Sequence, residues 1–145
     1  MKSLLLSLAT MLLLSTACKK TSRNESGIDA LPGTWELRKI VGGFTQQFPE
    51  GSGNFFKFTK SEYELYVDDT LFKKGTYAII TDKLAVGGEC PSNVQGFEKT
   101  DHLRIIYDGN TDSTKEAIEI TSGLLKLTSG CFALDYGVER QFVKK

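Results

Sequence analysis

Residues 62–80 read EYELYVDDTLFKKGTYAII, and this stretch has the pattern of a β-hairpin. Tyr63, Leu65 and Val67 alternate with glutamates and a tyrosine, a period of two that is typical of a strand with one buried face. Asp68-Asp69 follows, and aspartate is favoured in tight turns because its side chain hydrogen-bonds the nearby backbone. The stretch therefore predicts two antiparallel strands, 62–68 and 71–80, joined by a short turn.

The same alternation continues on both sides of this hairpin, and no stretch carries a long apolar face at helical spacing. Gly-containing pairs such as Asp108-Gly109 and Ser122-Gly123 mark further turns. The remaining strands are expected at 34–41, 53–60, 102–108, 115–121, 123–128 and 132–143, with a short extra strand near 83–87. Eight hairpin-connected strands predict an all-β, eight-stranded up-and-down antiparallel barrel over residues 32–145, because a sheet of this length has to hide its edges.

The composition limits the classes of function. The chain has 145 residues, 40% of them hydrophobic, which is enough for one globular domain. Lys and Arg number 18, as do Asp and Glu, so the net charge is zero and a nucleic-acid partner is not expected. The chain has one histidine, which excludes a site of several histidines around a metal.

Residues 1–17 have the order of a secretory signal peptide. Lys2 gives a basic start, an apolar run spans 4–14, and small residues lead up to Cys18. The run is 11 residues long, and as a helix it would reach only about 16 Å, too short for a hydrocarbon core of about 30 Å. Residues 18–31 are mostly polar and are expected to form a flexible tether in front of the barrel.

The segment Leu14-Ser15-Thr16-Ala17-Cys18 resembles a bacterial lipobox. The resemblance implies a lipoprotein of the bacterial cell envelope, held on the membrane by acyl chains such as palmitate on Cys18. Each buried CH₂ contributes about 0.8 kcal/mol, so several chains hold a protein firmly. Lys19 stands where an aspartate would imply retention in the inner membrane, so the outer membrane is implied. The alternative is an ordinary secretory signal followed by an incidental cysteine.

Two further cysteines, Cys90 and Cys131, are expected to pair in an oxidising compartment. Closing such a long loop stabilises a fold by about 3 to 5 kcal/mol in the chain-entropy account. The alternative is two separate thiols. Cys90 lies in the longest gap between expected strands, residues 87–100, which is expected to be a lid or a crossing loop.

Gly33-Thr34-Trp35 opens the first expected strand, and Arg140 lies on the apolar face of the last one. With residues 51–58 and 75–77, these motifs make the domain resemble the bacterial lipocalin-like lipoproteins. The resemblance implies that Gly33, Trp35 and Arg140 seal the barrel, with the guanidinium lying across the indole. Such a contact is worth about 0.5 to 2 kcal/mol, depending on how far the cation is desolvated.

The interior of such a barrel has two readings. Its candidate ligand-binding residues are Phe56, Phe58, Tyr63, Leu65, Tyr77, Ile79, Leu103, Ile105, Leu134 and Tyr136, and Trp35, Leu37, Leu125 and Leu127 join them inside. One reading is a cup for a small hydrophobic or amphipathic molecule. The other is a solid core, which would make the protein a structural or protein-interaction module whose partner is unknown.

Catalysis is not expected, nor is any cofactor or metal. His102 has no G-x-S-x-G motif near it and fits the solvent-facing side of a strand. The pair Asp68-Asp69 suits a turn better than an acid–base dyad. Asp108, Asn110 and Asp112 have the spacing of a calcium loop, but Ser113 stands where that loop needs glycine, so a plain hairpin turn is preferred.

Overall fold

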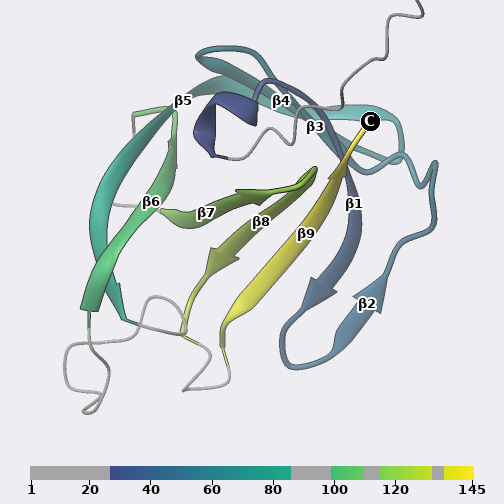
Figure 1. Cartoon of the computed structure of the whole chain (residues 1–145). Helices are drawn as coiled ribbons and strands as arrows, with labels where there is room; N and C mark the ends of the chain where they lie inside the picture. The colour runs from purple at the N-terminus through teal and green to yellow at the C-terminus, as the bar shows by residue number, and fades with distance from the viewer. Residues whose placement is uncertain (1–26, 86–98, 110–114, 132–135) are drawn as a thin grey trace, which may run out of the picture.

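The computed structural model describes residues 27–85, 99–109, 115–131 and 136–145 (Figure 1). In these residues one short 3₁₀ turn precedes nine strands. The elements are η1 (Ile28–Ala30), β1 (Gly33–Val41), β2 (Thr45–Gln47), β3 (Phe55–Phe58), β4 (Glu62–Val67), β5 (Thr70–Ala85), β6 (Lys99–Tyr107), β7 (Glu116–Thr121), β8 (Leu124–Ser129) and β9 (Val138–Lys144).

Eight of these strands close into an antiparallel barrel. From β3 to β9 each strand pairs with the next in the chain, β1 pairs with β3, and β9 returns to pair with β1 (Figure 1). The short β2 continues the β3 side of the barrel, because it pairs with Lys39–Val41 while β3 pairs with Gly33–Glu36. The predicted all-β, eight-stranded up-and-down barrel is confirmed.

The tight turns between neighbouring strands have the left-handed backbone that two-residue hairpins need. Asp68 and Asp69 have φ of 49° and 60°, and Ser122 and Gly123 have φ of 50° and 79°. Two consecutive residues with positive φ give a turn whose twist matches that of the flanking strands. The hairpins predicted at these two positions are therefore confirmed.

Several strand boundaries differ from the prediction. β5 runs on to Ala85 and takes in the described part of the extra strand expected near 83–87, because it pairs with β6 from Tyr77 to Ala85; β6 accordingly begins at Lys99, and β3 is shorter than expected. β9 begins at Val138 rather than at residue 132. The segment Thr45–Gln47 was not predicted, since all three side chains are exposed and only its pairing with β1 defines it.

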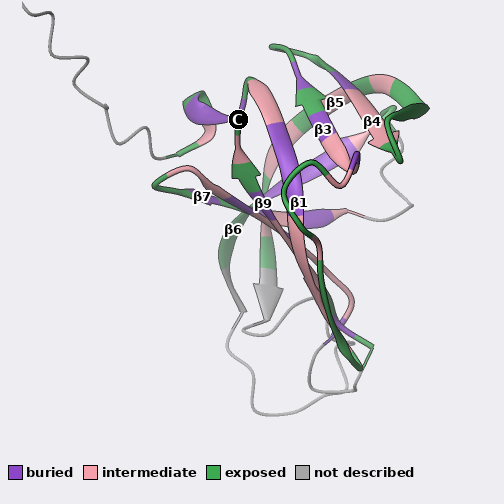
Figure 2. Ribbon diagram, turned by 90° about the vertical axis from the view of Figure 1, so that its right-hand side faces the viewer, coloured by how far each residue is buried: buried purple, intermediate pink, exposed green. Residues whose placement is uncertain are grey.

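The core lies inside the barrel and is sealed at one end by η1. Trp35, Ile105, Leu125 and Leu127 are fully buried, and the Trp35 Nε1–H donates a hydrogen bond to the Leu31 carbonyl at 2.6 Å. Figure 2 shows buried stretches in β1 and η1 and exposed hairpin tips. We call the barrel end next to η1 the η1 end, and the opposite end, where β6 and β9 begin, the Leu103 end.

The last residues of the expected tether belong to this seal. Ala30 and Leu31 are 2% and 1% exposed, so the expectation of a flexible tether through residue 31 is wrong for its final residues. Their apolar side chains pack onto the core, which gains more from burial than a polar linker would. The signal peptide 1–17 and residues 18–26 lie outside the described residues.

Outside the barrel, Glu36 fastens the loop between β2 and β3. Its Oε1 accepts the Gly51 N–H at 2.7 Å and lies 3.1 Å from Lys145 Nζ, and its Oε2 lies 3.1 Å from Arg38 Nη2. Burial raises the pKa of Glu36, but the hydrogen bonds and the nearby cations outweigh it and leave the pKa below its ordinary value. The carboxylate therefore stays charged and holds the loop that leads into β3.

Candidate ligand-binding interior

The η1 end of the interior is filled by aromatic rings. The Phe56 ring lies 5.1 Å from that of Phe58 and 5.5 Å from that of Phe142, measured between centroids. Tyr63 and Tyr107 meet edge-on at 4.8 Å. These are favourable aromatic geometries, and this half of the barrel is a packed core.

Most of the candidate ligand-binding residues do lie inside the barrel. Phe56, Phe58, Tyr63 and Ile105 are buried, and Leu65, Tyr77 and Ile79 are partly buried and pack against the core. These seven side chains belong mainly to the filled half. Leu134 lies outside the described residues.

Two candidates are not buried. Tyr136 is 52% exposed, because it precedes β9 and its N–H bonds back to the Cys131 carbonyl at 3.3 Å, so the prediction of an inward Tyr136 is wrong. Leu103 is 41% exposed although it shares the inward face of β6 with Ile105. Leu103 is therefore at the rim of the interior and not in its packed part.

The residue over the Trp35 indole is Lys144, whose Nζ lies 5.4 Å from the ring centroid. The pairing of β1 with β9 places Trp35 opposite Lys144 and Ile40 opposite Arg140, and Arg140 lies over the Phe56 ring at 5.9 Å instead. The predicted contact of Arg140 with Trp35 is therefore wrong, although a cation of the last strand does cover the indole.

Gly33 lies beneath this contact. Its φ is 134°, and a Cβ here would lie 3.1 Å from Lys144 Cε, so a side chain would crowd the lysine. The Lys144 Nζ also donates to the Ala30 carbonyl at 2.9 Å, which ties the last strand to η1.

Beyond the aromatic rings, an ion pair crosses the inside of the barrel. Arg140 is paired with Leu127 across β8 and β9, and Glu116 is paired with Ile105 across β6 and β7, so both share the face of fully buried residues. The Arg140 Nη2 lies 2.5 Å from each carboxylate oxygen of Glu116.

Tyr107 completes this cluster, which we call the interior polar cluster: Tyr107, Glu116 and Arg140. The Tyr107 hydroxyl donates to Glu116 Oε2 at 3.3 Å. Burial first, and then the Glu116 carboxylate, raises the pKa of Tyr107 well above its ordinary value. Tyr107 therefore remains a protonated donor.

The role of Glu116 was missed from the sequence, although a signal was present. Glu116 alternates with Ala117 and shares its parity with Ile118 and Ile120, which places it on the apolar face of its strand. Glu116 follows the calcium-like loop that begins at Asp108. Asn110 and Asp112 of that loop lie outside the described residues.

The Leu103 end of the interior is in contact with solvent. The side chain of Arg140 is 27% exposed, although it points to the inward face. Val138, two residues earlier on the same face of β9, is 36% exposed, and Leu103 is 41% exposed. The interior polar cluster thus lies between packed rings on one side and accessible aliphatic side chains on the other.

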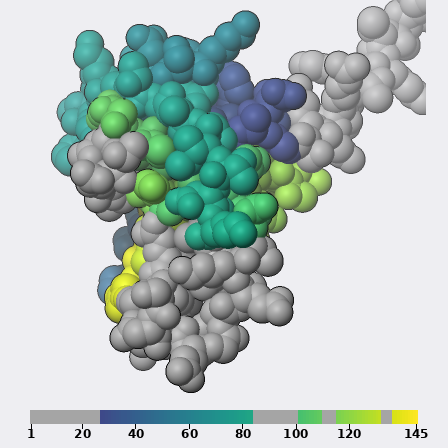
Figure 3. All heavy atoms as spheres, turned by 90° about the vertical axis from the view of Figure 1, so that its left-hand side faces the viewer, coloured from purple at the N-terminus to yellow at the C-terminus, as the bar shows by residue number. Residues whose placement is uncertain are grey.

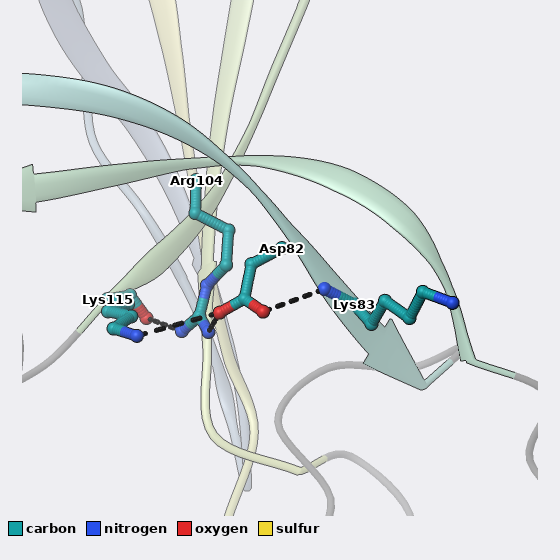
Figure 4. Close-up of polar contacts among 4 residues, drawn as sticks. All are labelled: Asp82, Lys83, Arg104 and Lys115. Atoms are coloured by element: carbon teal, nitrogen blue, oxygen red, sulfur yellow. Dashed lines mark hydrogen bonds and ion pairs between the residues drawn. The ribbon is translucent and has the colours of Figure 1, made fainter.

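A second ionic cluster lies on the outer face of the barrel (Figure 4). Arg104 donates from Nη1 to Asp82 Oδ2 at 3.0 Å and from Nη2 to the Lys115 carbonyl at 2.7 Å. The hydrogen bond from the Lys83 N–H is the main cause that lowers the pKa of Asp82, and the hydrogen bond from Arg104 lowers it further. The contacts join β5, β6 and the start of β7, so this cluster has a structural role.

Tyr63, Lys73 and Asp108 form a third polar group, near the turn after β6. Asp108 accepts from the Tyr63 hydroxyl at 3.1 Å and lies 2.9 Å from Lys73 Nζ. The hydrogen bond from Lys73 is the main cause that lowers the pKa of Asp108. Gly75 leaves room for this carboxylate, since a Cβ there would lie 1.8 Å from Asp108 Oδ1.

Gly75→Ala is therefore expected to cost about 1 to 3 kcal/mol of unfolding free energy, because the methyl group displaces the Asp108 carboxylate. Urea denaturation measures it. The matched control is Gly43→Ala, where a Cβ meets nothing within 4 Å and φ is not in the left-handed region. Equal midpoints for the two variants would contradict the expectation.

Two surface grooves flank the barrel. One, of about 490 Å³, crosses the outer face of β3, β4 and β5 and carries charges of both signs. The other, of about 480 Å³, lies between η1 and β5 and is lined by Ile28, Leu31, Tyr77 and Ile79 among others. Figure 3 shows η1 beside β5 on this face.

The remaining predicted residues are not part of the interior. His102 is exposed on the outer face of β6, as expected for a solvent-facing strand residue. Cys131 is fully buried, and Cys90 lies outside the described residues, as does Cys18, so the disulfide stays a prediction. Among the described residues, no three His, Cys, Asp or Glu side chains gather as metal ligands, and no helix has the length and hydropathy to cross a membrane.

The fold and interior define a class of protein: a closed antiparallel β-barrel with one packed end and a charged pair within it. No protein-family model, curated protein or solved structure matches the chain significantly.

Proposed function

We propose that this protein is a lipocalin-like lipoprotein of the bacterial cell envelope that binds a small hydrophobic or amphipathic molecule without catalysis. The observation that carries the proposal is the exposure of Arg140, 27% for an inward side chain. A solid barrel core would surround such a cation with packed atoms, whereas a cup leaves it in contact with solvent.

The arrangement of the interior supports a cup with a floor. The Phe56, Phe58 and Phe142 rings fill the η1 end, and η1 seals it. Toward the Leu103 end, the inward apolar side chains include Ile40, Ile79, Leu103 and Val138, none of them fully buried, and Thr81 stands opposite Leu103. Binding sites for small molecules combine such apolar walls with a few placed polar groups.

The binding function is tested on residues 18–145 carrying Cys18→Ser, exported with a cleavable signal peptide so that the chain is soluble. Nile red, a neutral hydrophobic dye, is titrated and its fluorescence is followed. Saturable binding at one site is expected, and Leu103→Asp is expected to weaken it by at least about tenfold, because the charge is placed among apolar walls. Absence of saturation would overturn the proposed binding function.

The lipid anchor is proposed from the lipobox resemblance, and the place where the described residues begin is compatible with it. The described chain begins at Gly27 beside η1, so a tether leaves from the sealed end and the Leu103 end faces away from it (Figure 1). An anchor at Cys18 would then hold the η1 end toward the membrane and leave the Leu103 end, and Arg140 behind it, accessible.

Cys18→Ser is expected to move the full-length protein from the membrane fraction to the soluble envelope fraction, because the thiol is the acceptor of the acyl chains. Fractionation followed by immunoblotting measures the shift. Ser22→Ala, in the same polar segment, serves as the control and should leave the distribution unchanged. Membrane retention of the Cys18→Ser chain would exclude this cysteine as the anchor.

A second candidate function, a protein-interaction module, is favoured by two exposed aromatic side chains, one in the turn between β1 and β2 and one near the start of β5. Phe44 is 76% exposed and Phe72 is 72% exposed. Affinity capture from envelope extract with Phe44→Ser and Phe72→Ser variants distinguishes the two functions. Capture that depends on these two side chains, together with no dye binding, would favour the module.

A further inference from the structure

We propose that the ligand of this barrel is a neutral amphiphile whose hydroxyl or carbonyl head binds at the interior polar cluster. Its alkyl tail extends toward the Leu103 end. The inference rests on the proposed binding function and adds the charge class of the ligand.

The cluster retains capacity for further hydrogen bonds. A guanidinium has five N–H donors, and the contacts of Arg140 with Glu116 use only those on Nη2. Nε and Nη1 of Arg140 bond to no side chain or carbonyl in the described ranges 27–85, 99–109, 115–131 and 136–145. A carboxylate accepts about four hydrogen bonds, and Arg140 and Tyr107 supply three to Glu116.

The charges of the cluster cancel, and this selects the head group. An anionic head near Arg140 is also near Glu116, 2.5 Å from that guanidinium, so repulsion offsets the attraction. A cationic head that binds Glu116 is in turn repelled by Arg140. A buried net charge is costly in either case. A hydroxyl can accept from Arg140 and donate to Glu116 without adding charge.

The surroundings of the cluster fit an alkyl chain. Ile40 and Ile79 are partly buried and pack against the core, while Leu103 and Val138 are more exposed on the inward face. Among the described residues, Lys83 and Asp101 come next on the same faces, just beyond Leu103 at the rim, and they stand opposite each other with opposite charges. Lys144 covers Trp35 at the other end of the barrel, beyond the packed aromatic rings.

The test uses the soluble residues 18–145 with Cys18→Ser and three probes with twelve-carbon chains: dodecanol, dodecanoic acid and dodecylamine. Each probe is titrated against bound Nile red at pH 7.5, at concentrations below those at which the probe aggregates, and displacement of the dye is followed. Dodecanol is expected to displace the dye at a concentration about tenfold lower than either charged probe. Suppose that the dye binds saturably but that dodecanoic acid or dodecylamine displaces it as well as dodecanol does, or better. That result overturns the head-group inference and leaves the proposed binding function standing.

The variant Glu116→Gln removes one charge and keeps the shape of the side chain. The uncompensated Arg140 is expected to strengthen dodecanoic acid about tenfold and to weaken dodecylamine. The matched control is Glu119→Gln, an exposed glutamate on the opposite face of the same strand, which should leave the ranking unchanged.

The double variant Glu116→Gln/Arg140→Gln restores a neutral interior and should again favour dodecanol. If Glu116→Gln fails to fold, the ranking in the parent chain and in this double variant decides the question. An unchanged ranking in a folded Glu116→Gln chain overturns the role of the cluster. Failure of every probe and of the dye overturns the proposed binding function itself.

Discussion

Replacing Trp35 with alanine is expected to lower the free energy of unfolding by about 3 to 5 kcal/mol. The indole is fully buried, donates to the Leu31 carbonyl at 2.6 Å and lies beneath Lys144. Its removal leaves a void where β1, β9 and η1 meet. Since small domains are stable by about 5 to 15 kcal/mol, the loss is a large part of the total. Urea denaturation followed by circular dichroism measures it.

Trp35→Phe is the control for the ring. It retains an aromatic side chain but removes the N–H, which leaves the Leu31 carbonyl without this donor, and the expected cost is about 1 to 3 kcal/mol. The alanine variant should therefore be the less stable of the two. A Trp35→Ala chain whose free energy of unfolding stays within about 1 kcal/mol of that of the parent would contradict the role of the indole as the seal between the first and last strands.

Arg140→Met is expected to cost about 3 to 5 kcal/mol at neutral pH. The substitution leaves Glu116, whose side chain is 7% exposed, as a buried carboxylate without its cation. Urea unfolding curves of the parent and the variant at neutral pH measure the loss of unfolding free energy.

The double variant Glu116→Gln/Arg140→Met separates the charge from the packing. Without the carboxylate, the buried charge is gone, and the double variant is expected to be more stable than Arg140→Met alone. A double variant as unstable as the single one would mean that Arg140 contributes through its methylene groups and not through the ion pair.

The sequence carried the local part of this fold. The alternation of Tyr63 and Leu65 with glutamates, and the turn at Asp68-Asp69, lie within a few residues of each other, so they are readable without the rest of the chain. β2 is just as local but carries no such pattern. Its three side chains are exposed, so no alternation marks it, and only its pairing with the end of β1 a few residues earlier makes it a strand.

In the candidate site, too, the residues with a local pattern could be predicted, and the residue that depends on a distant partner could not. Phe56, Phe58 and Ile105 could be placed inside from alternation alone. Glu116 was passed over because charged residues are rarely buried unless they are paired, and its partner Arg140 lies 24 positions away. Its shared face with Ile118 and Ile120 was the available signal.

The order of residues alone set the number of barrel strands, their hairpin order and the turns, because each follows from contacts between neighbours in the chain. The partners across the first and last strands were set by the tertiary structure. A register shift between Leu37 and Lys39 accompanies the closure of β9 on β1, which brings Lys144 over Trp35 and leaves Arg140 to meet Glu116 inside. Contacts between segments this far apart depend on closure of the whole sheet, and no local pattern encodes them.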